Sequence, residues 1–179
     1  MRDWNIVATV AQHRFKTACD LLQPLGPVKR THFYNTVVMK APDVGEFLET
    51  FSEWTQKYPD ASEAIVRVAP AMERFSFESA EEFERKAGEI LLRRLPELAG
   101  KGFHVRVHRR DRQSRFSQSA EERTLGEMLL DELEKVGAPG RTDFRDPDAI
   151  IDIETVDNEA GVSFWTREDL RKYPFLKLD

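Results

Sequence analysis

A strict alternation of apolar and polar side chains over residues 103–108 constrains the fold of this chain more than any other feature of its sequence. Successive side chains of a β-strand point to opposite faces, so this alternation predicts a strand that is buried on one face. We expect the opposite face, which carries His104 and Arg106, to be the more exposed one. The buried face is predicted to consist of Phe103, Val105 and Val107.

Helical patterns surround this predicted strand. Ser79 with Glu82, and Ser119 with Glu122, have the spacing of capping boxes, and apolar residues recur at helical intervals after each pair. An isoleucine-rich run at residues 149–154 follows and predicts a strand near the centre of a sheet. The second half of the chain therefore reads as a mixed module of helices and strands.

The first half of the chain has the order strand, helix, strand, helix, strand, with room for one more strand. Asp43 is predicted to cap the second of its helices. This order is that of a small ferredoxin-like unit, in which helices pack on one face of a sheet. The predicted segments are a strand at 4–10, a helix at 13–22, a strand at 34–41, a helix from 44 and a strand at 64–69.

We therefore predict the α+β fold class, with two modules in one chain. Residues 1–74 are expected to form the N-terminal ferredoxin-like module, and residues 75–179 the second, α/β module. The sequence contains no internal repeat, and no low-complexity linker separates the two modules.

Composition limits how this chain can bind nucleic acid and where in the cell we expect it. The chain has 179 residues and a net charge of −5, so any nucleic-acid site must be a local basic patch. No apolar run is long enough to cross a membrane, and we expect no membrane partner. Cys19 is the only cysteine, which fits a cytoplasmic protein without internal disulfides.

Common catalytic signatures are absent from the sequence. It contains no glycine-rich phosphate loop, no nucleophile elbow and no pair of cysteines for zinc. We accordingly expect that the chain is not an enzyme, has no catalytic residue, and binds neither a cofactor nor a metal. His104 and His108 share a strand face, but Arg106 lies between them and would repel a cation. Acids such as Asp152 and Glu154 are expected to form ion pairs with arginines on a neighbouring strand.

The segment 101–115 is the clearest candidate for a binding site. The segment contains several lysine and arginine residues and only one acid, Asp111, in a chain that is acidic overall. Arginine forks match phosphate oxygens, and the start of the helix that follows adds backbone amides. The predicted binding residues are Arg106, His108, Arg109, Arg110, Arg112, Arg115, Ser117 and Gln118.

These elements, in this order, resemble a THUMP domain. The matching stretches are 103–110, Ser117–Gln118, Leu125–Gly126, 146–148 and 151–154. They follow the family's strand, basic loop, helix with glycine, and Pro-Asp turn into a strand. On this resemblance, residues 75–179 are a THUMP domain.

The resemblance implies a function in tRNA modification. THUMP units, together with an N-terminal ferredoxin-like unit, bind the acceptor end of tRNA and hold a distant nucleotide near a catalytic domain. The chain resembles stand-alone THUMP proteins, one branch of which is an adaptor for a tRNA acetyltransferase. The resemblance therefore implies an adaptor that binds tRNA, not DNA, and presents it to a separate tRNA-modifying enzyme. Two alternatives stay open. One is a protein-interaction module that docks on an acidic partner without RNA. The other is a small metal-dependent enzyme that uses Asp148, Asp152 or Glu154.

Overall fold

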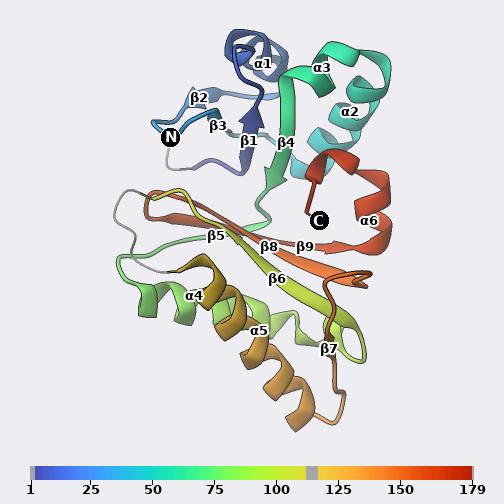
Figure 1. The fold of residues 1–179 in the computed structure, drawn as a ribbon. Coiled ribbons are helices and arrows are strands. Elements are labelled where there is room, and N and C mark those ends of the chain that lie inside the picture. Colours follow the sequence, from blue (N-terminus) through green and yellow to red (C-terminus); the bar gives the residue numbers. More distant parts are fainter. Residues whose placement is uncertain (1–2, 112–116, 179) are drawn as a thin grey trace. The chain divides into compact units, whose positions relative to one another are not determined.

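The computed structural model describes residues 3–111 and 117–178 (Figure 1). The chain divides into two compact units, each with its own sheet. The first comprises Met1–Met72 and Leu170–Lys177, and the second comprises Glu73–Asp169 and Leu178–Asp179.

The sheet of the first unit has four strands in the order β2-β3-β1-β4. All of its neighbouring strands are antiparallel, and a helical connection precedes both β2 and β4. This is the strand order of two interleaved split βαβ units, as expected for a ferredoxin-like module. Its strands are β1 (Ile6–Val10), β2 (Val28–Arg30), β3 (Thr36–Met39) and β4 (Ile65–Pro70).

The helices of this unit begin and end where local sequence signals place them. The Asp43 carboxylate accepts a hydrogen bond of 2.7 Å from the amide of Glu46, which confirms the predicted cap. Pro59 has no amide hydrogen to donate, so it is suited to the first position of a helix. A helix ends at Lys57, and the next one begins at Pro59. The helices are α1 (Phe15–Leu22), η1 (Gln23–Leu25), α2 (Val44–Lys57) and α3 (Pro59–Ala64).

The end of the chain also packs into the first unit. The ring of Phe175 meets that of Phe51 edge-on, with 4.9 Å between centroids. Arg67 Nε donates to the carbonyl oxygen of Leu176 over 3.0 Å. The part of the chain end that belongs to this unit, Leu170–Lys177, contains the second half of α6 (Arg167–Lys172) and all of η3 (Pro174–Leu176).

The second unit contains a mixed five-stranded sheet in the order β5-β9-β8-β6-β7. β6 runs parallel to β7 and β8, whereas β9 is antiparallel to β5 and β8. β8 contains the isoleucine-rich run and lies at the centre of the sheet, as predicted. The strands are β5 (Glu73–Ser76), β6 (Gly102–His108), β7 (Arg141–Thr142), β8 (Ala149–Val156) and β9 (Glu159–Thr166).

Helices α4 (Ala80–Arg93) and α5 (Gln118–Lys135) cover one face of this sheet, and η2 (Leu95–Leu98) follows α4 (Figure 1). Their apolar stripes meet the apolar face of the strands in one core. The predicted buried face of β6 is confirmed, since Phe103, Val105 and Val107 all belong to this core. The fold is α+β, as the sequence predicts, and none of the described helices has the length and apolarity of a membrane span.

Two local expectations were wrong. His104 was expected on an exposed face, but the residue is only 4% exposed, because the chain after β7 folds over it. Ser119 was expected to cap α5, but Ser117 is the N-cap residue, and Glu122 binds a strand amide instead of closing a capping box. The other capping box behaves partly as predicted, because Ser79 Oγ accepts from the amide of Glu82.

Candidate nucleic-acid interface

Glu122 joins the end of β6 to the beginning of α5. Its Oε1 accepts hydrogen bonds from the amide of Val107, at 2.9 Å, and from Gln118 Nε2, at 3.3 Å. β7 pairs with β6 only at Gly102 and Phe103, so the Val107 amide lies on a part of β6 that β7 does not reach. One carboxylate therefore brings the strand that leads into the basic segment next to the first turn of the helix that follows it.

The predicted binding residues lie on these two elements. Arg106 and His108 belong to β6, and both are half-buried. Ser117 and Gln118 begin α5 and are exposed. Ser117 caps no amide with its side chain, so the helix start is available to an anion.

The arginines that follow β6 are already in ion pairs. Arg110, two residues after the end of β6, pairs with the buried carboxylate of Glu154 on β8, which confirms the expected pairing with an arginine for Glu154. Arg109 Nε lies 3.6 Å from the carboxylate of Asp111. Both guanidinium groups remain partly exposed, at 17% and 25% of the side chain. Each can still meet a phosphate, but its charge is partly balanced.

Three further arginines were predicted to bind RNA: Arg106, Arg112 and Arg115. The side chain of Arg106 makes no ion pair or hydrogen bond with another residue of 3–111 or 117–178. Arg112 and Arg115 lie outside the described residues.

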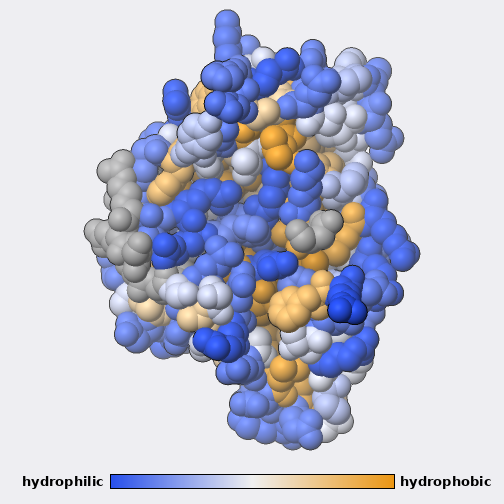
Figure 2. All heavy atoms as spheres, in the orientation of Figure 1, coloured by the Kyte–Doolittle hydropathy of each residue, from blue (hydrophilic) through white to orange (hydrophobic). Residues whose placement is uncertain are grey.

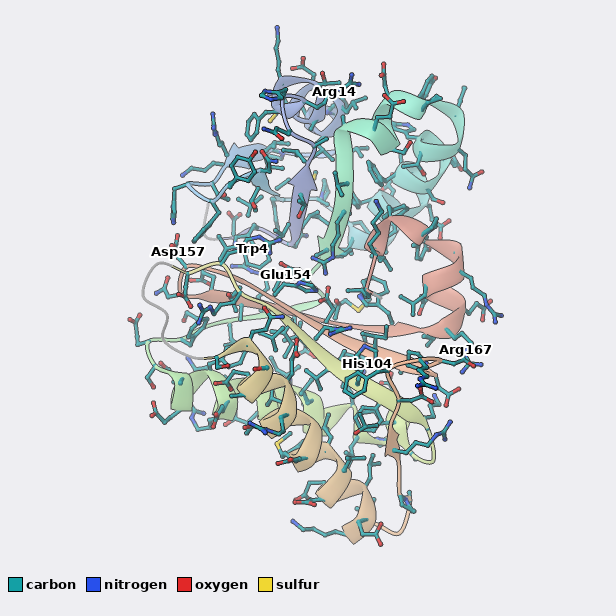
Figure 3. All side chains as sticks on the ribbon, viewed as in Figure 1. Trp4, Arg14, His104, Glu154, Asp157 and Arg167 are labelled. Atoms are coloured by element: carbon teal, nitrogen blue, oxygen red, sulfur yellow. The ribbon has the colours of Figure 1, made fainter. Side chains whose placement is uncertain are left out.

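Three side chains on the strand face opposite the helices could hold a metal ion. His108, Asp152 and Glu154 offer ligand atoms within 4.8 Å of one another. His108 Nε2 lies 3.5 Å from Asp152 Oδ1, and both acids are buried (Figure 3 labels Glu154). The guanidinium of Arg110 on Glu154 supplies a positive charge where a metal would bind, so the group also has the composition of an ion-pair network.

Asp148, a further acid considered for metal chemistry, has a structural position. Its carboxylate accepts from the amide of Gly102 at 2.9 Å and pairs with Arg167 at 3.0 Å. Its own amide donates to the carbonyl of Gly102 over 2.7 Å. These bonds fix the start of β8 beside the start of β6, which explains the Pro-Asp turn in the sequence.

His104 lies beneath an aromatic ring that sequence reasoning did not single out. Its Nδ1 is 2.7 Å from the carbonyl oxygen of Asp143, and its ring is 5.1 Å from that of Phe144. Burial lowers the pKa of His104 below its ordinary value. The imidazole is therefore neutral near pH 7, and Nδ1 must carry the proton because a carbonyl oxygen only accepts. Nε2 is then an acceptor.

A cavity of about 290 Å³ lies between β6, α5 and the chain after β7. Apolar groups from β6 and α5 form its wall, and exposed polar groups of α5 form part of its rim. Figure 2 shows orange, hydrophobic side chains among blue ones where α5 and β7 lie in Figure 1. Its lining includes His104, Ser119, Arg123, Gly126, Leu130 and Phe144.

Arg123 is a cationic residue of this region that the sequence analysis did not select. It is exposed on α5, and its side chain has no ion pair with any other residue that the structure describes. Arg123 was missed because it lies outside the arginine-rich segment. Its position about one turn after the start of the predicted helix could have identified it as a further cation near the binding site.

Beneath the start of α5 lies a buried acid. Glu121 is 4% exposed and faces α4. Burial, and then the nearby carboxylates of Glu84 and Glu81, raise the pKa of Glu121 to about 7. The first turn of α5 therefore loses negative charge as the pH falls below 7.

Comparisons with known proteins identify the fold. No protein-family model matches the sequence, and no curated protein is detectably similar to it in sequence. Three solved structures illustrate the structural matches. TrmN from Thermus thermophilus aligns with a TM-score of 0.56 and 20% identity, over 89% of this chain and 44% of that one. A possible methylase from Clostridium difficile 630 aligns with a TM-score of 0.57 and 11% identity, over 90% and 40%. A 4-thiouridine synthetase in complex with RNA and ATP aligns with a TM-score of 0.53 and 13% identity, over 91% and 42%.

The fold is THUMP-like. The THUMP-like chain spans about half, or less, of the length of the solved structures that it matches. At this level of identity the likeness concerns the fold alone.

The expectation that the chain is not an enzyme is corrected by these structures. They include a possible methylase and a 4-thiouridine synthetase with bound ATP, so the fold occurs in enzymes. The expectation rested on missing catalytic signatures, and such signatures can lie in the parts of those chains that the present 179 residues do not cover. Their absence here is no argument against catalysis.

Proposed function

We propose that this chain binds tRNA through its second module, residues 75–179, and presents it to the active site of a tRNA-modifying enzyme. The observation that carries the proposal is the junction at Glu122, where β6 and the start of α5 meet beside the arginine-rich segment. A THUMP-like fold with this junction supports an RNA ligand, and a 4-thiouridine synthetase of the same fold was solved in complex with RNA.

The chemistry of the junction suits a phosphate backbone. Arg109 and Arg110 leave β6 with partly exposed guanidinium groups, and Arg123 adds a cation on α5. The uncapped start of α5 contributes amides and the positive end of the helix dipole. Such contacts hold RNA in position, whereas unpaired bases supply most of the sequence information.

We propose that the chain binds the acceptor end of tRNA. We also propose that it does so in the cytoplasm. Holding one end of a tRNA fixes the distance to a nucleotide elsewhere in the molecule. A modifying enzyme can then use the binding energy to place its target base, which lowers the entropic part of the barrier.

The decisive experiment measures the affinity of the purified chain for an unmodified tRNA transcript and for double-stranded DNA of equal length. We expect tighter binding to tRNA, with an affinity that falls steeply between about 50 and 300 mM salt. Equal binding to the DNA, or no binding to tRNA at low salt, would refute the proposal.

A second measurement separates RNA binding from docking on an acidic protein. The chain is purified from cells, with and without ribonuclease treatment, and small RNA in the sample is sequenced. We expect tRNA to be retained and to be lost after ribonuclease treatment. A deletion strain should also lose one modified nucleoside from total tRNA, and an unchanged nucleoside profile would contradict the role in modification.

A further inference from the structure

The cavity between β6, α5 and the chain after β7 has the features of a built binding site rather than a gap in packing. Its volume is about 290 Å³, close to the lower limit for small-molecule sites. This is room for one heteroaromatic ring system. The wall is largely apolar, as in pockets that bury a flat ligand.

An aromatic ring at the cavity is available for stacking. Phe144 lines the cavity and is 65% exposed, so a face of its ring is open to a ligand. The buried ring of His104 supports one side of it, with 5.1 Å between centroids and 35° between planes. Single-stranded nucleic acids are commonly bound by such exposed rings, because every base has a face that can stack.

A buried acceptor beside this ring lacks a donor. His104 lines the cavity, and its Nε2 has no hydrogen-bond partner among the residues that the structure describes. Nδ1 donates to the carbonyl of Asp143, so Nε2 can only accept while the ring is neutral. An unsatisfied buried acceptor is costly, and a ligand with an amino or imino group offers the missing donor.

Gly126 keeps the helix side of the cavity open. A Cβ atom at this position would meet no heavy atom within 4 Å, so the space beside α5 is empty rather than packed. Glycine in the middle of a helix is less favourable than alanine, so helix stability does not explain why position 126 lacks a side chain. Arg123, one turn earlier on α5, provides a cation for the phosphate of a bound nucleotide.

We propose that this cavity binds one unpaired nucleobase of the RNA, stacked on Phe144, with its sugar-phosphate directed toward Arg123 and the start of α5. The inference rests on the proposed function and adds to it a site that reads single-stranded RNA. It assigns His104 as a residue that favours bases with a hydrogen-bond donor.

The test compares two short RNA hairpins, one with a single-stranded 3′ extension and one with a blunt end. The wild-type chain should prefer the extended hairpin. Gly126→Leu fills the cavity while it improves helix propensity, and Phe144→Ala removes the stacking surface at an exposed position. Each should weaken binding of the extended hairpin by roughly five- to a hundred-fold. Binding of the blunt hairpin should stay as in the wild type.

Matched variants complete the design. Phe144→Tyr keeps an aromatic face and should keep the preference for the extended hairpin, and Gly126→Ala controls for helix propensity with a smaller side chain. If the wild type prefers the extended hairpin and both Gly126→Leu and Phe144→Ala keep that preference, the nucleobase pocket is refuted while tRNA binding stands. If the wild type binds neither hairpin nor tRNA, the proposed function itself fails.

Discussion

The guanidinium of Arg110, which follows β6, pairs with the carboxylate of Glu154 on β8. The carboxylate is almost fully buried, whereas part of the guanidinium reaches solvent. An arginine that the sequence assigns to phosphate binding therefore also balances a buried charge in the sheet. Substitution of this residue has two effects that experiments must separate.

Replacing Arg110 with alanine should lower the stability of the second unit. The change leaves the buried charge of Glu154 without its guanidinium, and we expect a loss of about 1–3 kcal/mol in the free energy of unfolding. Urea denaturation followed by circular dichroism measures it. Arg85→Ala is the control, because its ion pair with Glu89 is exposed, at 58% and 59% of the two side chains, and should contribute little to stability. Equal losses in both variants would show that the Glu154 pair has no special weight.

Charge removal at the other arginines should change the salt dependence of RNA binding. Arg109, Arg112 and Arg115 are replaced by alanine one at a time, and tRNA affinity is measured over a range of salt concentrations. Each lost phosphate contact should reduce the slope of log affinity against log salt by roughly 0.7 to 0.9. Slopes identical to that of the wild type in all three variants would place the phosphate contacts elsewhere on the chain.

Periodicity in the sequence predicts the apolar face of β6 because burial acts on every second residue. Phe103 and Val107 lie in the core for that reason. The ion pair of Glu154 with an arginine was also predictable, since an acid within an isoleucine-rich strand needs a cation when it is buried. Both predictions depend on interactions within a sheet, which leave a pattern in the sequence.

Burial of His104 was not predictable in the same way. It results from Asp143 and Phe144, which follow a two-residue strand that has no periodic signal of its own. The cap of α5 was misjudged for a related reason. Ser119 and Glu122 have capping-box spacing, but the amide of Val107 competes for the glutamate, and only the tertiary fold brings that amide near.

Stability should depend on pH through Glu121. Its pKa is raised to about 7 from 4.5, so the folded chain holds this proton over a range where the unfolded chain has released it. The folded state is thus favoured at low pH, and the advantage is lost as the pH rises from about 5 to about 8.

Glu121→Gln should remove this dependence. At pH 8 the variant should be more stable than the wild type by about 1–3 kcal/mol, and at pH 4 the difference should nearly vanish. Denaturation at several pH values measures it, with exposed Glu134→Gln as control. A difference that does not change with pH would contradict the buried acid.

The bond between Glu122 and the amide of Val107 should couple stability to RNA binding. Glu122→Ala leaves a strand amide without its acceptor on the part of β6 that β7 does not reach, and we expect a loss of about 1–2 kcal/mol. It also frees the start of α5 from β6, so tRNA affinity should fall although a negative charge has been removed. Glu122→Gln keeps a carbonyl acceptor and should restore most of the stability and the binding. If Glu122→Ala instead binds tRNA more tightly than Glu122→Gln does, the residue acts through its charge and not by holding β6 and α5 together.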